Sequence, residues 1–157
     1  TTVACGEGAE GFAVSPDGKC IWVGNLEAGT ITVLDAAKKS VARTFEAPGN
    51  PVRLYFLDAD RVLGVQRKRN ELALFDAHSF TELGPRLKFP VPRITGDGPV
   101  MDKTSAPMMV EFHPDGRLAY VANSHSELVS VVDLEAWKHV GFYKAGVKPD
   151  PLAVYVP

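Results

Sequence analysis

The chain has 157 residues, of which 45% are hydrophobic, and a formal net charge of −2. This length and apolar content are those of one ordinary domain with its own core. The charge argues against a broad phosphate-binding surface, so we expect no nucleic-acid partner. No apolar run approaches the roughly 20 residues of a membrane helix, so we expect no membrane span.

The first 46 residues read as a β-prone run followed by four strands. Residues 1–5 form the β-prone run. The sequence SPDG at residues 15–18 has the composition of a tight turn, because Pro fixes φ, Asp caps locally and Gly accepts a positive φ. Residues 30–35 (TITVLD) alternate apolar and polar with period two, as a half-buried strand does. The expected strands lie around residues 12–14, 20–23, 30–35 and 41–45.

A shift of 42 residues repeats this pattern in a weaker form, and a shift of 98 repeats it closely. In the second copy the expected strands are residues 51–56, 61–66, 72–76 and about 80–83, and the Pro-Asp-Gly turn is missing. In the third copy Asp115, Asn123 and Asp133 match Asp17, Asn25 and Asp35. We place the three units at residues 9–46, 51–89 and 106–143, an inserted loop at 84–105, and single flanking strands at 1–5 and 151–156.

A unit of about 42 residues with four short strands is the size of one β-propeller blade. A lone blade exposes both apolar faces, so blades stack on their neighbours and the ring must close. We therefore predict an all-β fold, a β-propeller of four-stranded antiparallel blades, with about three complete blades in this chain. Three blades do not close a ring of seven or eight, so the expected partner is the remainder of the propeller, from missing N-terminal residues or from a second chain.

Two segments carry a family resemblance. SPDGKCIWVGNLEAGTITVLDAAKKSVARTF and HPDGRLAYVANSHSELVSVVDLEAWKHVGFY resemble the YVTN-type β-propeller repeat, whose units read roughly P-D-G-K, then Y-V-A-N, then V-x-V-I-D. The second copy departs from this pattern, with GVQ at residues 64–66 where Val-x-Asn is expected. The resemblance implies a propeller like those of surface-layer and cytochrome-d1-like proteins, and a periplasmic or extracellular location.

The candidate site follows from strand alternation. Loops between second and third strands share one face with the connections between blades, and the other turns lie on the opposite face. Loops on a rigid scaffold often carry function. The candidate ligand-binding residues on this face are Asn25, Glu27, Arg67, Arg69, Arg93, Asp97, Asn123, His125 and Glu127, with Asp102 and Lys103 also in the inserted loop.

Several of these residues have a second interpretation. Asn25 and Asn123 also suit a structural role, capping a strand end through local hydrogen bonds. His125 with Glu127 suits metal binding or proton transfer, but no third ligand is specified. Residues 67–69 (RKR) suit a solvated loop or an anionic partner.

The two cysteines are too few for a disulfide framework. Cys5 ends the run at 1–5 and Cys20 begins a second strand, so alternation places them on opposite faces, too far apart for a disulfide. We predict two free thiols.

No familiar catalytic, haem, zinc or phosphate-binding motif is present in the sequence. We therefore predict no catalytic residue and no metal site, and leave any cofactor open. The favoured function is a non-catalytic binding or scaffold module that presents its loop face to a protein or small-molecule partner. The alternative is an extracytoplasmic enzyme or cofactor protein, because propellers with similar blades include lactone hydrolases and haem-d1-binding proteins.

Overall fold

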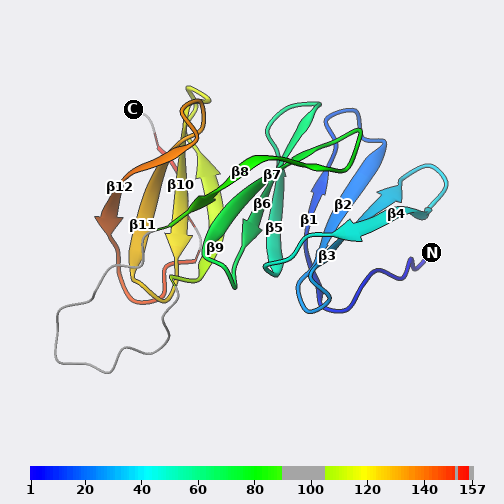
Figure 1. The fold of residues 1–157 in the computed structure, drawn as a ribbon, viewed down its shortest axis with the longest axis horizontal. Helices are drawn as coiled ribbons and strands as arrows, with labels where there is room; N and C mark the ends of the chain where they lie inside the picture. The colour runs from blue at the N-terminus through cyan, green and yellow to red at the C-terminus, as the bar shows by residue number, and fades with distance from the viewer. Residues whose placement is uncertain (90–104, 151, 156–157) are drawn as a thin grey trace. The chain divides into compact units, whose positions relative to one another are not determined.

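The computed structural model describes residues 1–89, 105–150 and 152–155. Within these residues the helices and strands found are all β-strands, and they form three four-stranded sheets (Figure 1). In each sheet the strands lie side by side in chain order, and the hydrogen-bonded pairs are antiparallel. The predicted all-β fold of four-stranded antiparallel sheets is confirmed.

The strand bounds follow the repeat. The first sheet contains β1 (Ala9–Val14), β2 (Cys20–Asn25), β3 (Thr30–Asp35) and β4 (Ser40–Glu46). The second contains β5 (Pro51–Phe56), β6 (Arg61–Gln66), β7 (Glu71–Asp76) and β8 (Glu82–Lys88). The third contains β9 (Pro107–Phe112), β10 (Leu118–Asn123), β11 (Leu128–Asp133) and β12 (Lys138–Lys144).

The second repeat differs from the first in two places: its second strand lies at residues 61–66, as predicted, but its fourth strand differs from the prediction. Its first turn, residues 57–60, is one residue shorter than residues 15–19 of the first repeat, so β6 follows β2 by 41 residues and not 42. The fourth strand is β8, and not the predicted segment around residues 80–83. The Asp76 carboxylate caps a turn by accepting from the backbone N–H groups of His78 and Ser79. Phe80 then takes a left-handed φ of 61°, so the strand begins only after it.

The two predicted flanking strands are wrong for the residues that the structure describes. Residues 1–5 and 152–155 form no strand. A β-strand needs a hydrogen-bonded neighbour, and neither segment pairs with any of the three sheets. Residues 151 and 156, at the ends of the second predicted strand, lie outside the described part.

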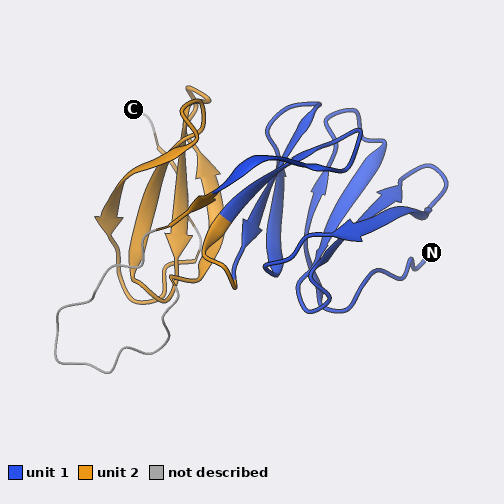
Figure 2. Cartoon of the chain, viewed as in Figure 1, with its two compact units in different colours: residues 1–67, 72–86 blue, residues 68–71, 87–157 orange. Residues whose placement is uncertain are grey.

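The chain divides into two compact units (Figure 2). Unit 1 comprises residues 1–67 and 72–86, and unit 2 comprises residues 68–71 and 87–157. Unit 1 therefore holds the first sheet and most of the second, and unit 2 holds the third. The prediction that residues 1–157 form a single domain stays a prediction.

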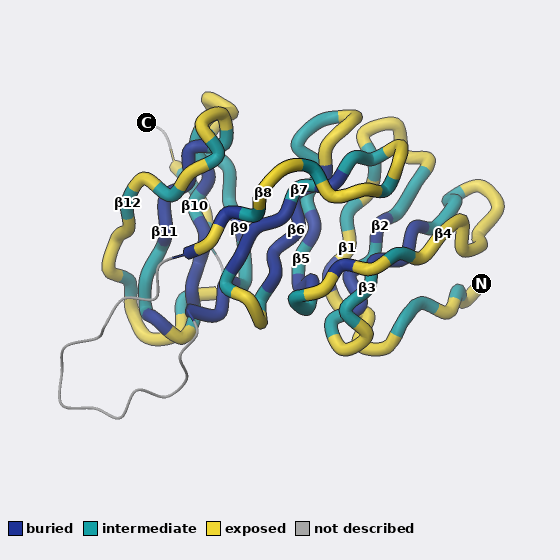
Figure 3. The backbone as a smooth tube through the Cα atoms, in the orientation of Figure 1, coloured by how far each residue is buried: buried dark blue, intermediate teal, exposed yellow. Residues whose placement is uncertain are grey.

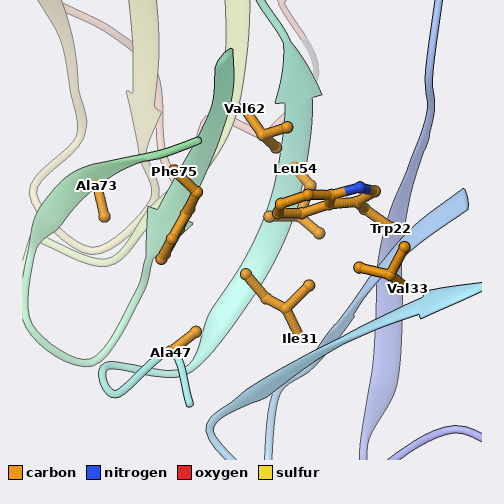
Figure 4. Close-up of a cluster of buried hydrophobic side chains, with 8 residues drawn as sticks. All are labelled: Trp22, Ile31, Val33, Ala47, Leu54, Val62, Ala73 and Phe75. Carbon is orange, nitrogen blue, oxygen red and sulfur yellow. The ribbon is translucent and has the colours of Figure 1, made fainter. Parts of the chain in front are cut away.

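The core of unit 1 forms between its two sheets (Figure 4). Trp22 is 1% exposed and makes edge-to-face ring contacts with Phe45 and Phe56, at centroid distances of 5.4 and 6.0 Å. Such ring pairs contribute about 1 kcal/mol each beyond the area that they bury. Trp22 thus packs between the two sheets of unit 1. The other buried members of the cluster are Ile31, Val33, Ala47, Leu54, Val62, Ala73 and Phe75.

Two glycines allow the sheets of unit 1 to approach closely. A Cβ on Gly11 in β1 would lie 2.3 Å from the carbonyl oxygen of Val52 in β5. A Cβ on Gly24 in β2 would lie 2.5 Å from the carbonyl oxygen of Pro51. Both contacts are with backbone, which cannot rotate away, so only glycine fits at these two positions.

The core of unit 2 lies in the third sheet. Strands β10 and β11 contribute fully buried residues, while residues 114–117 in the turn between β9 and β10 are exposed (Figure 3). The buried apolar side chains of this sheet are Val110, Ala119, Val121, Ala122, Val131 and Val132.

Candidate ligand-binding loop face

The structure places the connections of each sheet on two opposite ends of its strands. We name the loops 26–29, 67–70 and 124–127 the loop face, and the remaining turns of each sheet the turn face. On the turn face, the residue after each third strand donates to a residue of the first turn in the same sheet. These pairs are Ala36 N to Lys19 O, Ala77 N to Asp60 O and Leu134 N to Arg117 O, at 2.9, 2.7 and 2.9 Å.

Each loop of the loop face is held at both ends by backbone hydrogen bonds. The residue after the second strand donates to the residue before the first strand, as Leu26 does to Gly8 at 2.8 Å. The residue after the fourth strand donates to the last loop residue, as Ala47 does to Gly29 at 2.9 Å. The equivalent bonds in the other sheets are Arg67 to Asn50, Ser124 to Ala106, Phe89 to Asn70 and Ala145 to Glu127.

These clamps require a left-handed backbone at the same places in every sheet. The residues before the first strands are Gly8, Asn50 and Ala106, with φ of 70°, 63° and 48°. The last loop residues are Gly29, Asn70 and Glu127, with φ of 66°, 57° and 55°. Gly and Asn adopt this conformation at low cost, and Ala106 and Glu127 are held in it by the clamps.

Asn25 and Asn123 are buried beneath their loops. Asn25 is 0% exposed. Its Oδ1 accepts from the Gly6 N–H at 3.1 Å, and its Nδ2 donates to the hydroxyls of Thr30 and Thr32, both at 2.9 Å. Asn123 is 1% exposed and donates to the carbonyl of Val121 and the Ser130 hydroxyl. These contacts agree with the structural interpretation of both residues, and they leave neither amide at the protein surface for a ligand.

The charged candidates lie at the loop surface instead. Glu27, Arg69 and His125 are exposed, and Arg67 and Glu127 are half-buried. Within the described part of the chain, the side chains of these five residues make no ion pair or hydrogen bond. The loops therefore combine fixed backbones with unpaired charged side chains.

The structure joins the loops in pairs within each unit. In unit 1, the Asn50 side chain donates to the carbonyl of Leu26 while the Asn50 carbonyl accepts from Arg67 N. Loop 26–29 and Arg67 are therefore neighbours.

In unit 2, the Asn70 carboxamide oxygen accepts from the N–H groups of Ser105 and Ala106, at 2.9 and 3.2 Å. The Ser105 carbonyl accepts from His125 N at 3.1 Å. Arg69 and His125 thus belong to neighbouring segments of one unit. The candidates Arg93 and Asp97, with Asp102 and Lys103, lie outside the described residues.

The turn face of unit 1 contains a cavity of about 430 Å³ that the sequence did not predict. Its walls include Cys20, Trp22 and Phe56, and its rim includes Asp17 and His78. The Asp17 carboxylate accepts from Lys19 N, Ser15 Oγ and Lys19 Nζ, and these contacts, led by the backbone N–H, lower its pKa to about 2. The nearby Asp60 carboxylate raises the pKa of His78, whose Nε2 lies 2.9 Å from Asp60 Oδ1.

Three further observations concern metal ligands, membrane spans and cysteines. In the part of the chain that the structure describes, no group of three or more His, Cys, Asp or Glu side chains could hold a metal ion. Among the same residues, no helix is long and apolar enough to cross a membrane. Cys5 and Cys20 are free thiols, as predicted.

Comparison with known proteins places the fold. The chain matches no protein-family model, and no curated protein is significantly similar to it. Among solved structures it resembles hydrazine synthase of Kuenenia stuttgartiensis, with a TM-score of 0.74 and 19% identity over 94% of this chain and 39% of that one. This structure is a β-propeller. The chain therefore has a β-propeller fold.

Two lyases show the same likeness. A streptogramin B lyase matches with a TM-score of 0.68 and 13% identity, over 88% of this chain and 41% of the lyase. A catalytically inactive virginiamycin B lyase from Staphylococcus aureus, solved with quinupristin, matches with a TM-score of 0.70 and 14% identity, over 90% of this chain and 44% of the lyase. The chain thus spans about two fifths of these propellers, which is the extent expected of a segment of a ring. At these identities the likeness concerns the fold alone.

Proposed function

We propose that this chain is a non-catalytic propeller module that presents its loop face to a protein or small-molecule partner. The observation that carries the proposal is the construction of the loops. Their ends are fixed by repeated backbone hydrogen bonds, while Glu27, Arg69 and His125 at their tips are exposed. A rigid base lowers the entropy that a loop loses on binding, and exposed charges supply specificity and steer association.

The same proposal includes further propeller sheets as the structural partner. The face of β1 that carries Phe12 and Val14 leaves these side chains 67% and 49% exposed. The alternate residue Gly11 faces the second sheet, which covers that side of β1. Blades bury both faces in a closed ring, so we propose that another sheet covers Phe12 and Val14. This sheet would come from a longer form of the same protein or from a second chain.

The repeat type and the cellular location expected from the sequence are also part of the proposal. The Pro-Asp-Gly turns at Asp17 and Asp115 share one geometry, in which the carboxylate accepts from the backbone N–H two residues later, at 3.0 and 2.8 Å. This repeated turn supports repeats of YVTN type. We also propose an exported, periplasmic or extracellular location, which cell fractionation of the organism that produces the protein would test.

Site-specific photo-crosslinking tests the binding role. Glu27 and His125 are each replaced by p-benzoylphenylalanine, and Lys39 on the turn face, which is also exposed, is replaced in a matched control. We expect one defined cross-linked species at the two loop positions and none at position 39. Identical products at all three positions would contradict a loop-face partner.

The alternative is an enzyme or cofactor protein that uses His125 and Glu127. Hydrolysis of γ-butyrolactone and the visible absorption spectrum of the natively purified protein distinguish this function from the first. We expect neither turnover nor a visible band. Lactone hydrolysis that His125→Ala abolishes, with the unfolding midpoint unchanged, would replace the scaffold function by a catalytic one.

A further inference from the structure

The cavity on the turn face of unit 1 has the size and composition of a small-molecule site. Its volume of about 430 Å³ lies within the range of about 300–1,000 Å³ typical of ligand pockets. Phe56, Ala59 and Ala77 line it and keep exposed surface, whereas Trp22, also in its lining, is only 1% exposed. The half-buried Phe56 ring gives an aromatic guest a partner for edge or face contacts.

The charged groups at the rim are already paired. Asp17 has Lys19 Nζ at 3.2 Å, and Asp60 has His78 Nε2 at 2.9 Å. A charged guest would find no unpaired partner in these two pairs and would lose part of its hydration in the apolar cavity, whereas a neutral guest loses less. The rim therefore selects against a net charge on the ligand.

His78 presents a ring nitrogen for a further hydrogen bond. His78 uses Nε2 for Asp60, and its Nδ1 has no hydrogen bond within the described residues. This nitrogen accepts a hydrogen bond in the neutral ring and donates one in the protonated ring. A hydroxyl group suits both states because it both donates and accepts.

We propose that this cavity binds a small neutral aromatic molecule that carries one hydroxyl group. The ring lies against Phe56, and the hydroxyl bonds to His78 Nδ1. The site is on the opposite face from the loops, so it is independent of the proposed loop-face function.

Ligand-observed ¹⁹F NMR with 4-fluorobenzyl alcohol tests the proposal on the full chain. For nine heavy atoms we expect a Kd of roughly 0.1–1 mM. The cationic 4-fluorobenzylamine and the anionic 4-fluorobenzoate have nearly the same shape, and we expect each to bind at least about five-fold more weakly. Absence of binding up to about 10 mM alcohol, or tighter binding of either charged probe, would overturn the proposal.

Variants locate the site. Ala59 lines the cavity and is exposed, so Ala59→Trp should fill the cavity and abolish binding. Ala37→Trp, at an exposed turn position of the first sheet outside the cavity lining, is the matched control and should bind as the parent does. Binding that survives Ala59→Trp would show that the probe lies elsewhere and would refute the assignment.

The role of His78 has its own measurement. We expect His78→Ala to weaken the alcohol about five-fold, the effect of one lost hydrogen bond. The same variant should leave 4-fluorotoluene, which has no hydroxyl, unchanged. Equal losses for both probes would show that His78 only shapes the cavity, and the hydroxyl specificity would be wrong.

Cys20 also lines the cavity. In a Cys5→Ser background, bound alcohol should slow alkylation of Cys20 by iodoacetamide.

Discussion

The close approach of the two sheets in unit 1 gives the sharpest test of how this chain packs. In Gly11→Ala, the new methyl carbon would lie 2.3 Å from Val52 O and 2.9 Å from the Arg53 Cα. Ordinary non-bonded contacts are about 3.5 Å, so β1 and β5 would have to separate locally by about 1 Å. The backbone of Gly11 is not in the left-handed region, so an alanine there would not strain φ, and this cost is purely steric.

The expected loss of unfolding free energy is about 3 kcal/mol, the upper part of the range for overpacking, because backbone atoms cannot move aside. With a urea dependence of about 1.5 kcal/mol per molar, the midpoint should fall by about 2 M. Trp22 lies at the affected interface and is 1% exposed, so its fluorescence reports the transition. Trp137→Phe removes the other tryptophan signal.

Gly141→Ala is the matched control. Gly141 lies in β12, a methyl group added to it would have no other described atom within 4 Å, and it has no left-handed φ. The same substitution there should change stability by less than about 0.5 kcal/mol. If Gly11→Ala unfolds within 0.5 kcal/mol of Gly141→Ala, the sheets do not approach at Gly11 and the packing argument fails.

Three further predictions concern the turns and the strand ends. The pKa of Asp17 is about 2 in the fold and 3.8 in its absence, so its stabilising contribution is complete above pH 3.8 and is lost as the pH falls toward 2; Asp17→Asn should flatten this part of a pH–stability curve measured by urea unfolding. Asn25→Ala removes three hydrogen bonds and should lower the unfolding free energy by about 2–3 kcal/mol, whereas Glu27→Ala at the loop tip should change it by less than about 0.5 kcal/mol. Gln66 is 0% exposed, and its amide has no hydrogen-bond partner in the described part of the chain. Gln66→Met should therefore raise the unfolding free energy by about 1 kcal/mol, and Gln66→Glu should lower it. A stabilising Gln66→Glu would show that the amide site accepts a charge and would contradict this prediction.

The fold could be predicted because its signals are local and repeated. Asp17 and Asp115 cap their own turns within two or three residues, and the alternation in residues 30–35 marks a strand. The alternation wrongly predicts a half-buried strand there, because Ile31, Thr32 and Val33 are all buried. Because the sequence is periodic, each weak turn or strand pattern recurs in other copies, which strengthens the prediction. The same reasoning failed at Phe80, because a left-handed φ at a large aromatic residue has no local sequence signature and is imposed by the Asp76 cap.

The cavity could not be predicted for a different reason. Cys20 and His78 are distant in sequence and belong to different sheets, and only packing brings them to one cavity. The sequence around His78 (DAHS) reads as an ordinary turn, with Asp76 as its cap. The pairing of His78 with Asp60 depends on how two turns of one sheet meet, which no spacing rule gives.

The strand-end position shared by Asn25, Gln66 and Asn123 shows how a repeat loses its pattern. In the first and third sheets the Asn amide donates to a hydroxyl seven residues later, on Thr32 and on Ser130, at 2.9 Å in both. In the second sheet the partner position is Ala73, which packs in the apolar core, and the Asn is replaced by Gln. Both positions of the pair therefore differ from those of the other two sheets, and Gln66 lacks the hydroxyl partner that Asn25 and Asn123 have. The exchange is incomplete, because Gln66 retains two buried polar atoms where the apolar surroundings of Ala73 favour none.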